Sequence, residues 1–129
     1  MSDPIFLLEE EIFQKFPGTE SDIASVHEWM DNTPLFTPKK NAKLVFRLVI
    51  EPVSQFEKDT LEMLGTYDEF PDDAERTNEI VWLLENGHPQ LPIFVDEQDG
   101  FIMEGRHRIV AFYLQNLPTV PTIYIKKIE

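Results

Sequence analysis

Residues 91–114, LPIFVDEQDGFIMEGRHRIVAFYL, contain the pattern that decides the fold. Two short apolar runs, Pro92–Val95 and Phe101–Met103, predict a pair of strands. The polar segment Asp96–Gly100 between them ends in Asp-Gly, a pair that favours a hairpin turn. The apolar residues within Arg106–Leu114 predict a helix directly after the second strand. The stretch therefore predicts a β-hairpin that continues into a helix.

The flanking segments extend this unit to a small α+β domain. On its C-terminal side, Asn116 suits the left-handed end of a helix, and Thr122–Ile125 predicts a last strand. On its N-terminal side, residues 43–50 alternate as a strand does, and helices are expected over 54–64 and Ala74–Glu85. The resulting order, β, α, α, β, β, α, β, indicates a small mixed β-sheet with packed helices.

Local signals predict further details of these elements. Ser54 and Glu57 have the spacing of a capping box at the start of a helix. Gly65 follows the last apolar residue of that helix, where a positive φ is expected. Trp29 and Trp82 are expected in the core, because large apolar side chains are usually buried.

Residues 1–40 precede this pattern and are predicted to form a helical extension. Residues 5–16, IFLLEEEIFQKF, are interpreted as a short helix or an irregular arm. A helix over Asp22–Met30 is expected after a cap at Thr19 or Ser21. We expect this extension to pack on the domain formed by 41–129, so that the chain makes one compact unit.

Composition limits the classes of function. The chain has 129 residues, 42% of them hydrophobic, which suffices for one core and argues against a disordered acidic tail. It has no cysteine, so disulfides, iron–sulfur clusters, thiolate zinc sites and cysteine catalysis are excluded. No apolar run has the roughly 18 residues that a membrane span needs, and the N-terminus lacks the features of a signal peptide. The sequence therefore predicts a soluble, cytoplasmic protein with no membrane partner.

The charge is unevenly distributed along the chain. Asp and Glu outnumber Lys and Arg by 24 to 11, and the formal net charge of −13 opposes broad binding to nucleic-acid phosphates. Residues 101–129 nevertheless carry four bases and two acids, and two of those bases, Arg106 and Arg108, flank His107. A local cationic site on an acidic protein suggests a small anion as its ligand.

The turn 104–108 is the main candidate for a functional site. Gly105 lies between strand and helix, where a missing Cβ lets the backbone turn and a ligand approach. The first backbone N–H groups of the helix favour an anion, as does its dipole. Two arginines at that positive end, Arg106 and Arg108, are unfavourable without an anion. We expect both to project from an exposed helix start; alternatively, they pair with the acids of 72–99.

Residues 79–125 resemble the core of the ParB/sulfiredoxin superfamily. The resemblance rests on LPIFVD at 91–96, the turn EGRHR at 104–108 with the apolar helix after it, and TVPTIYI at 119–125. It implies a ParB/sulfiredoxin-like fold for 41–129. The helix-turn-helix domain of the chromosome-partitioning ParB proteins has no counterpart here, so sequence-specific DNA binding is not expected.

The resemblance also implies functional residues. In sulfiredoxin-like and free-serine-kinase-like members the Gly-x-His-Arg turn binds nucleotide phosphates, and Gly105, His107 and Arg108 occupy those positions. Glu104 matches an acidic active-site residue of the kinase-like members. Arg106 replaces the catalytic cysteine of sulfiredoxin, which excludes sulfinic-acid reduction by that route. Family members also contact phosphates from the preceding helix, where the candidates are Arg76, Thr77 and Asn78.

Three functions follow. The first is binding of a nucleotide or small phosphorylated ligand, with hydrolysis or phosphoryl transfer that uses Glu104, Arg106 and His107, and with Mg²⁺ beside ATP, ADP or CTP. The second is an acidic interaction module or inhibitor, including a nucleic-acid mimic, that binds a basic protein. The third, a ParB-like nuclease, is disfavoured by the net charge. Further carboxylates are either Mg²⁺ ligands or solvated ends of elements: Asp72, Asp73, Glu75, Asp96, Glu97 and Asp99.

Overall fold

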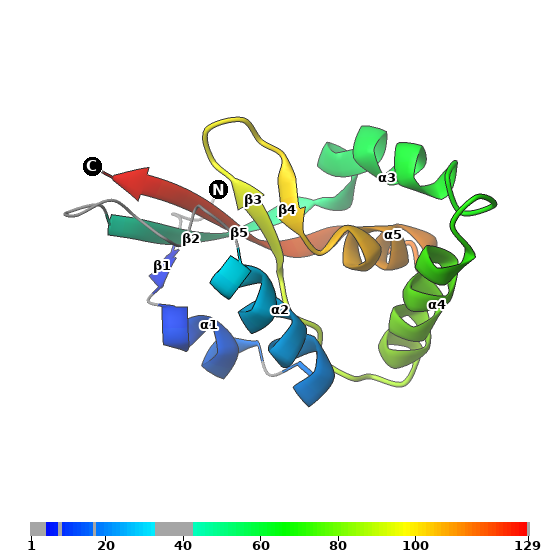
Figure 1. Ribbon diagram of the computed structural model, residues 1–129, viewed down its shortest axis with the longest axis horizontal. Helices are drawn as coiled ribbons and strands as arrows, with labels where there is room; N and C mark the ends of the chain where they lie inside the picture. Colours follow the sequence, from blue (N-terminus) through cyan, green and yellow to red (C-terminus); the bar gives the residue numbers. More distant parts are fainter. Residues whose placement is uncertain (1–4, 8, 17, 33–42, 129) are drawn as a thin grey trace.

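The computed structural model describes residues 5–7, 9–16, 18–32 and 43–128, which contain one mixed sheet (Figure 1). The five strands have the order β1-β2-β5-β3-β4. The β3–β5 pair is parallel, and the β1–β2, β2–β5 and β3–β4 pairs are antiparallel. Their bounds are Ile5–Leu7 (β1), Lys43–Pro52 (β2), Ile93–Asp96 (β3), Ile102–Glu104 (β4) and Thr119–Ile128 (β5).

Within the described residues, five α-helices accompany the sheet, and a short 3₁₀ turn, η2, precedes the third. From β2 onward the order is β, α, α, β, β, α, β, so the predicted α+β class with a small mixed sheet is confirmed. Figure 1 shows α5 between α3 and α4. The bounds are Glu9–Lys15 (α1), Glu20–Asn32 (α2), Val53–Phe56 (η2), Glu57–Leu64 (α3), Pro71–Glu85 (α4) and Arg106–Leu114 (α5).

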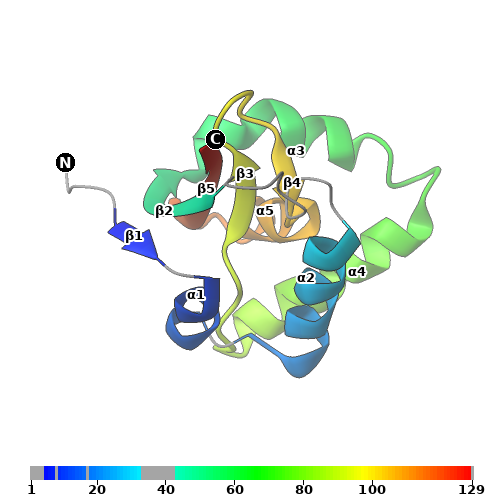
Figure 2. The same cartoon turned by 60° about the vertical axis from the view of Figure 1, so that its left-hand side comes forward.

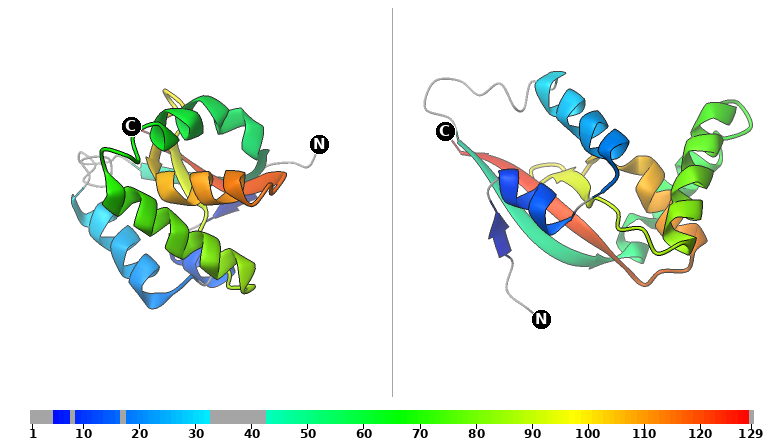
Figure 3. Two further views of the ribbon diagram at one scale, coloured as in Figure 1. Left: turned by 90° about the vertical axis from the view of Figure 1, so that its right-hand side faces the viewer. Right: turned by 90° about the horizontal axis from the view of Figure 1, so that it is seen from below.

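Two hydrophobic clusters pack on the sheet, because successive strand residues point to opposite faces. Phe94 on β3 belongs to the first cluster, together with Ile12 of α1 and Val26 of α2. Its neighbours Ile93 and Val95 belong to the second cluster, with apolar residues of α3, α4 and α5. Helices α1 and α2 therefore cover one face, and α5 with its neighbours covers the other (Figures 2 and 3).

The N-terminal segment adds both an edge strand and two helices. Strand β1 pairs with β2, and α1 follows it, so the interpretation of this part as a short helix or arm missed a strand. Thr19 caps α2, because the backbone N–H of Asp22 donates a 3.1 Å hydrogen bond to Thr19 Oγ1. Ile12 and Val26 are fully buried against the sheet.

Three of the local predictions are wrong, each for a tertiary reason. Ser54 lies inside η2, and within the described residues no side-chain hydrogen bond caps η2 or α3. Gly65 has φ −65°, because the chain continues in right-handed turns beyond α3. Trp82 is 58% exposed, because α4 turns Thr77 and Ile80 inward instead. The expectation for Asn116 is confirmed by its φ of 55°.

Tyr124 on β5 donates a hydrogen bond to Glu51 on β2. Burial and this carboxylate raise the pKa of Tyr124 to about 12, from the ordinary tyrosine value of 10.0. The neutral phenol therefore stabilises the fold fully below the unfolded pKa, and this contribution is lost as the pH rises through about 12. The ultraviolet titration curve of Tyr124→Phe is subtracted from that of the wild type. We expect the difference to show one phenolate that appears near pH 12. A difference step at the ordinary tyrosine pKa would contradict the raised value.

Candidate functional site

The turn between β4 and α5 has the geometry that its glycine predicts. Gly105 has φ 102° and directly precedes Arg106, the first residue of α5. A Cβ at Gly105 would lie 2.9 Å from Ile93 Cγ2 and 3.0 Å from Arg108 Nη2. The expectation that the missing Cβ lets a ligand approach is therefore corrected. The space beside Gly105 is filled by β3 and by the guanidinium of Arg108.

A pocket of about 230 Å³ lies beside this turn, and we call it the α5 pocket. Its walls come from α2, α4, the end of β4 and the first turn of α5. Asp22 of α2 and Arg76 of α4 meet beside this pocket, where the long Arg76 side chain reaches the Asp22 carboxylate. Its charged and polar lining residues are Asp22, Ser25, Arg76, Glu104, His107 and Arg108.

Arg108 is buried in this pocket, with 4% of its surface exposed. Its Nε and Nη2 atoms have no hydrogen-bond partner among the described residues. Glu104 Oε1 lies 3.9 Å from Nη2, beyond hydrogen-bond distance. Burial lowers the pKa of Arg108, and the carboxylates of Glu104 and Asp22 oppose that shift. A guanidinium nevertheless stays protonated in proteins, so the pocket contains a buried cation with two free donors.

The expectation that both arginines project from an exposed helix start is confirmed for Arg106 and wrong for Arg108. Arg106 is exposed, whereas Arg108 is buried. Two residues along an α-helix differ by about 200° around its axis. Because α5 begins at Arg106, Arg108 turns toward α2 and α4, and the two side chains line different pockets.

Asp22 on α2 contributes a buried carboxylate to the α5 pocket. Asp22 Oδ1 accepts a hydrogen bond from Arg76 Nη2, and Arg76 Nη1 lies 3.0 Å from Glu79 Oε2. Burial alone would lower the pKa of Arg76, but these two carboxylates outweigh it and raise the pKa. Asp22 is 2% exposed, and its Oδ2 has no hydrogen-bond partner in the part of the chain that the structure describes. Asp22 carries no signal in the sequence that marks it as a site residue, because an acidic residue in a first helical turn is common.

His107 connects α5 to α4. Its Nε2 lies 2.9 Å from Asp73 Oδ1 in the first turn of α4, and both side chains are partly exposed. An ionised carboxylate accepts only, so Nε2 is the donor in this bond. This contact holds the ring beside the α5 pocket, which His107 also lines.

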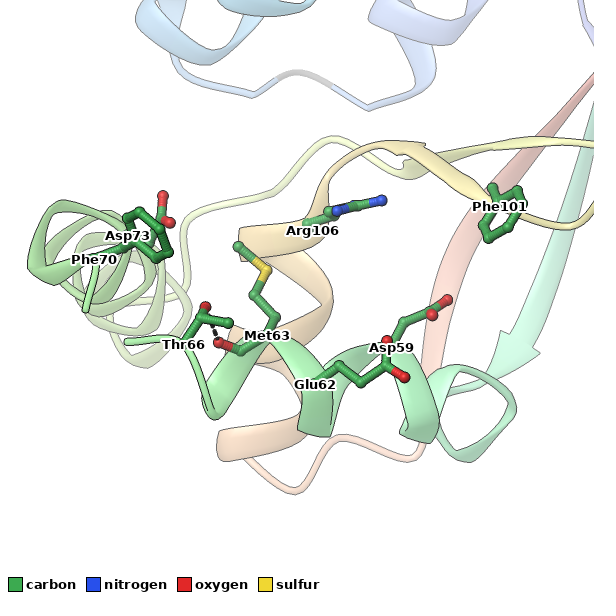
Figure 4. A pocket seen from close by; sticks show the side chains of 8 residues that line it. All are labelled: Asp59, Glu62, Met63, Thr66, Phe70, Asp73, Phe101 and Arg106. Atoms are coloured by element: carbon green, nitrogen blue, oxygen red, sulfur yellow. Dashed lines mark hydrogen bonds between the residues drawn. The ribbon is translucent and has the colours of Figure 1, made fainter. Parts of the chain in front are cut away.

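Arg106 lines a second pocket of about 370 Å³, which we call the acidic groove (Figure 4). Figure 4 shows Arg106 extending from the start of α5 toward the side of Phe101, with Met63 below it. Phe70 and Phe101 lie at opposite ends and are 54% and 60% exposed. The carboxylates of the groove are Asp59, Glu62 and Asp73.

The remaining predicted site residues lie elsewhere on α4. Thr77 is buried, and its hydroxyl lies 2.5 Å from Tyr67 Oη. Asn78 is exposed and lines neither the α5 pocket nor the acidic groove, the two described pockets at this turn. Of the predicted phosphate-binding residues, the structure brings together Gly105, His107, Arg108 and Arg76.

A resident metal ion does not fit these residues. Among the described residues, no group of three or more His, Asp or Glu side chains could hold a metal. The free oxygen of Asp22 also lies in a pocket with two guanidinium groups, those of Arg76 and Arg108, which repel a cation.

None of the described helices combines the length and the apolar character that a membrane span requires.

Comparisons with known proteins supply no relative for this chain. No family model, curated protein or solved structure matches it. Function is therefore inferred from the geometry and charge of the α5 pocket and the acidic groove.

Proposed function

We propose that the α5 pocket binds the phosphate group of a nucleotide or small phosphorylated ligand, within a ParB/sulfiredoxin-like fold. The observation that carries this proposal is the burial of Arg108 with Nε and Nη2 lacking partners among the described residues. Leaving a charged donor buried and unsatisfied is costly, so such groups usually meet a ligand or an ordered water. The guanidinium provides the paired donors that suit phosphate oxygens.

The surroundings of Arg108 support an anionic ligand. Helix α5 has nine residues, and its first backbone N–H groups have no intrahelical acceptor. His107 and Arg76 line the same pocket. The Gly-x-His-Arg resemblance points to Gly105, His107 and Arg108, which this pocket includes. Arg106 and Asn78 are left out of the proposed phosphate contacts, since neither lines it.

Hydrolysis or phosphoryl transfer is the catalytic part of the proposal. Glu104 is the carboxylate at the turn, 3.9 Å from Arg108, and it would accept the proton of an attacking water or acceptor hydroxyl. Arg108 and the α5 amides would stabilise the charge on the phosphate oxygens. Mg²⁺ would arrive with the phosphates of ATP, ADP or CTP, because no group of three or more His, Asp or Glu side chains in the described part of the chain could hold it.

The proposal is tested by calorimetric titration with ATP, ADP, CTP, GTP and inorganic phosphate, each with and without Mg²⁺. At a hundredfold excess over Kd, a ligand of the folded state adds about 2.7 kcal/mol to stability, so the melting temperature should rise. We expect Glu104→Gln to bind with similar affinity and to lower any turnover by about 10²–10⁴-fold. Failure of every nucleotide and of phosphate to bind would overturn the proposal.

The acidic groove favours a second candidate function, binding of a basic protein partner. Three carboxylates line it with a single arginine, and its two phenylalanines expose more than half of their surface. A lysine or arginine side chain gains from carboxylates and from an aromatic face. The net charge of −13 would accelerate encounter with such a partner.

We expect Asp59→Asn with Glu62→Gln to weaken binding of a labelled Lys- and Phe-containing peptide by about tenfold at low salt, since each close charge pair contributes up to about 1 kcal/mol. The matched control is Glu10→Gln with Glu20→Gln, which removes two exposed carboxylates from α1 and α2. Fluorescence anisotropy measures both affinities. An equal loss in the two double variants would show that the net charge alone attracts the peptide, without a defined groove.

A further inference from the structure

We infer that the α5 pocket selects a phosphate group that carries a proton, such as inorganic phosphate or a terminal phosphate monoester, over sulfate and phosphodiesters. This inference rests on the proposed phosphate site and deepens it. It concerns Asp22, the one carboxylate that the N-terminal segment contributes to the pocket lining.

Asp22 presents an acceptor that a fully ionised oxyanion cannot satisfy. Its side chain is 2% exposed, Oδ1 is paired with Arg76, and Oδ2 has no hydrogen-bond partner from described residues. A carboxylate in an ion pair accepts hydrogen bonds and donates none. A ligand that pairs with Asp22 Oδ2 must therefore donate a hydrogen bond to it.

Arg108 presents the opposite requirement in the same pocket. Its Nε and Nη2 are donors, and both lack a hydrogen-bond partner in the described part of the chain. Asp22 and Arg108 line the same pocket, one from α2 and the other from the first turn of α5. A ligand that satisfies both must accept from Arg108 and donate to Asp22.

A protonated phosphate has both properties. Its unprotonated oxygens accept from the guanidinium, and its P–O–H group donates to the Asp22 carboxylate. Phosphate monoesters lose their last proton with a pKa of about 6, so a protonated fraction remains at neutral pH. Sulfate and phosphodiesters have no hydrogen to donate there. Their oxygens would face Asp22 Oδ2 as two acceptors with like charge, which is unfavourable in a buried site.

The competing occupant is an ordered water. One water can donate to Asp22 Oδ2 and accept from Arg108, since buried waters usually bridge polar groups in this way. In that case the pocket needs no anion, and none of the oxyanions will bind to it.

The experiment is a calorimetric titration of the full chain with four probes at equal ionic strength and in EDTA: inorganic phosphate, methyl phosphate, sulfate and dimethyl phosphate. We expect the first two to bind about tenfold more tightly than the last two, because sulfate and dimethyl phosphate leave the buried Asp22 Oδ2 without a donor. Asp22→Asn should bring phosphate and sulfate to similar affinities, because the amide can donate. The control is Glu79→Gln. Glu79 is the other carboxylate paired with Arg76, but Glu79 itself does not line the pocket, so this variant should still bind phosphate more tightly than sulfate.

The outcomes separate this inference from the proposal on which it rests. Equal binding of phosphate and sulfate by the wild type overturns the inference and leaves the phosphate site standing. No binding of any of the four probes overturns the inference and supports the water, and the titration with nucleotides then decides whether the phosphate site exists. If circular dichroism shows that Asp22→Asn does not fold, the wild-type comparison of the four probes still decides.

Discussion

Arg108→Ala is expected to abolish the rise in melting temperature that phosphate or a nucleotide produces, whereas Arg106→Ala leaves it intact. The two arginines are separated by one residue but line different pockets. Loss of two charge-assisted hydrogen bonds at about 1.5–3 kcal/mol each corresponds to a Kd at least about 100-fold higher. Arg106 is exposed and does not line the α5 pocket.

Thermal melts with and without ligand measure this difference. Since Arg108 is buried, Arg108→Met serves as a second variant that preserves much of the side-chain volume without its donors. Both Arg108 variants should keep the far-ultraviolet circular dichroism of the wild type. A lost ligand response in Arg106→Ala, with a retained response in both Arg108 variants, would place the anion in the acidic groove instead.

Gly105→Val is expected to destabilise the fold by about 2–5 kcal/mol, irrespective of any ligand. A residue with a Cβ at positive φ costs roughly 1–2 kcal/mol, and overpacking adds about 1–3 kcal/mol. The overpacking arises because the new Cβ would lie 2.9 Å from Ile93 Cγ2 and 3.1 Å from Ile93 Cα. The backbone of a central strand cannot move aside as a flexible side chain does.

Gly87→Val is the matched control for this substitution. Gly87 also has a positive φ, 74°, but a Cβ there would meet no described atom within 4 Å. We expect it to lose only the backbone part, about 1–2 kcal/mol, in urea unfolding. Equal losses at the two glycines would show that the contact with Ile93 is relieved without cost. Because Gly105→Val acts on folding first, reduced binding by this variant says little about a ligand.

The hairpin and the helix after it could be predicted because their signals are local. The Asp-Gly turn, the apolar runs on either side and Gly105 each determine the backbone within a few residues. The structure accordingly contains β3, β4 and α5 in the predicted places. Strand β1 carries no such signal, because three residues become a strand only by pairing with β2.

The candidate site was only partly predictable, because its charges are brought together by tertiary packing. Arg76 and Asp22 are separated by 54 residues, and His107 and Asp73 by 34. Nothing near Asp22 in the sequence distinguishes it from an ordinary residue of a first helical turn. The burial of Arg108 likewise depends on α2 and α4 covering that side of α5, which the sequence of α5 alone does not contain.

The walls of the α5 pocket also determine how the two hydrophobic clusters depend on each other. Helix α2 belongs to the cluster on one face of the sheet, and α5 belongs to the cluster on the other. Both contribute charged residues to the pocket, where Glu104 stands at the end of the edge strand β4. An anion held between Arg108 and Asp22 would therefore connect the two hydrophobic clusters that the sheet otherwise separates. Its binding would make their unfolding more cooperative, so that the N-terminal helices could not detach while the ligand stayed in place.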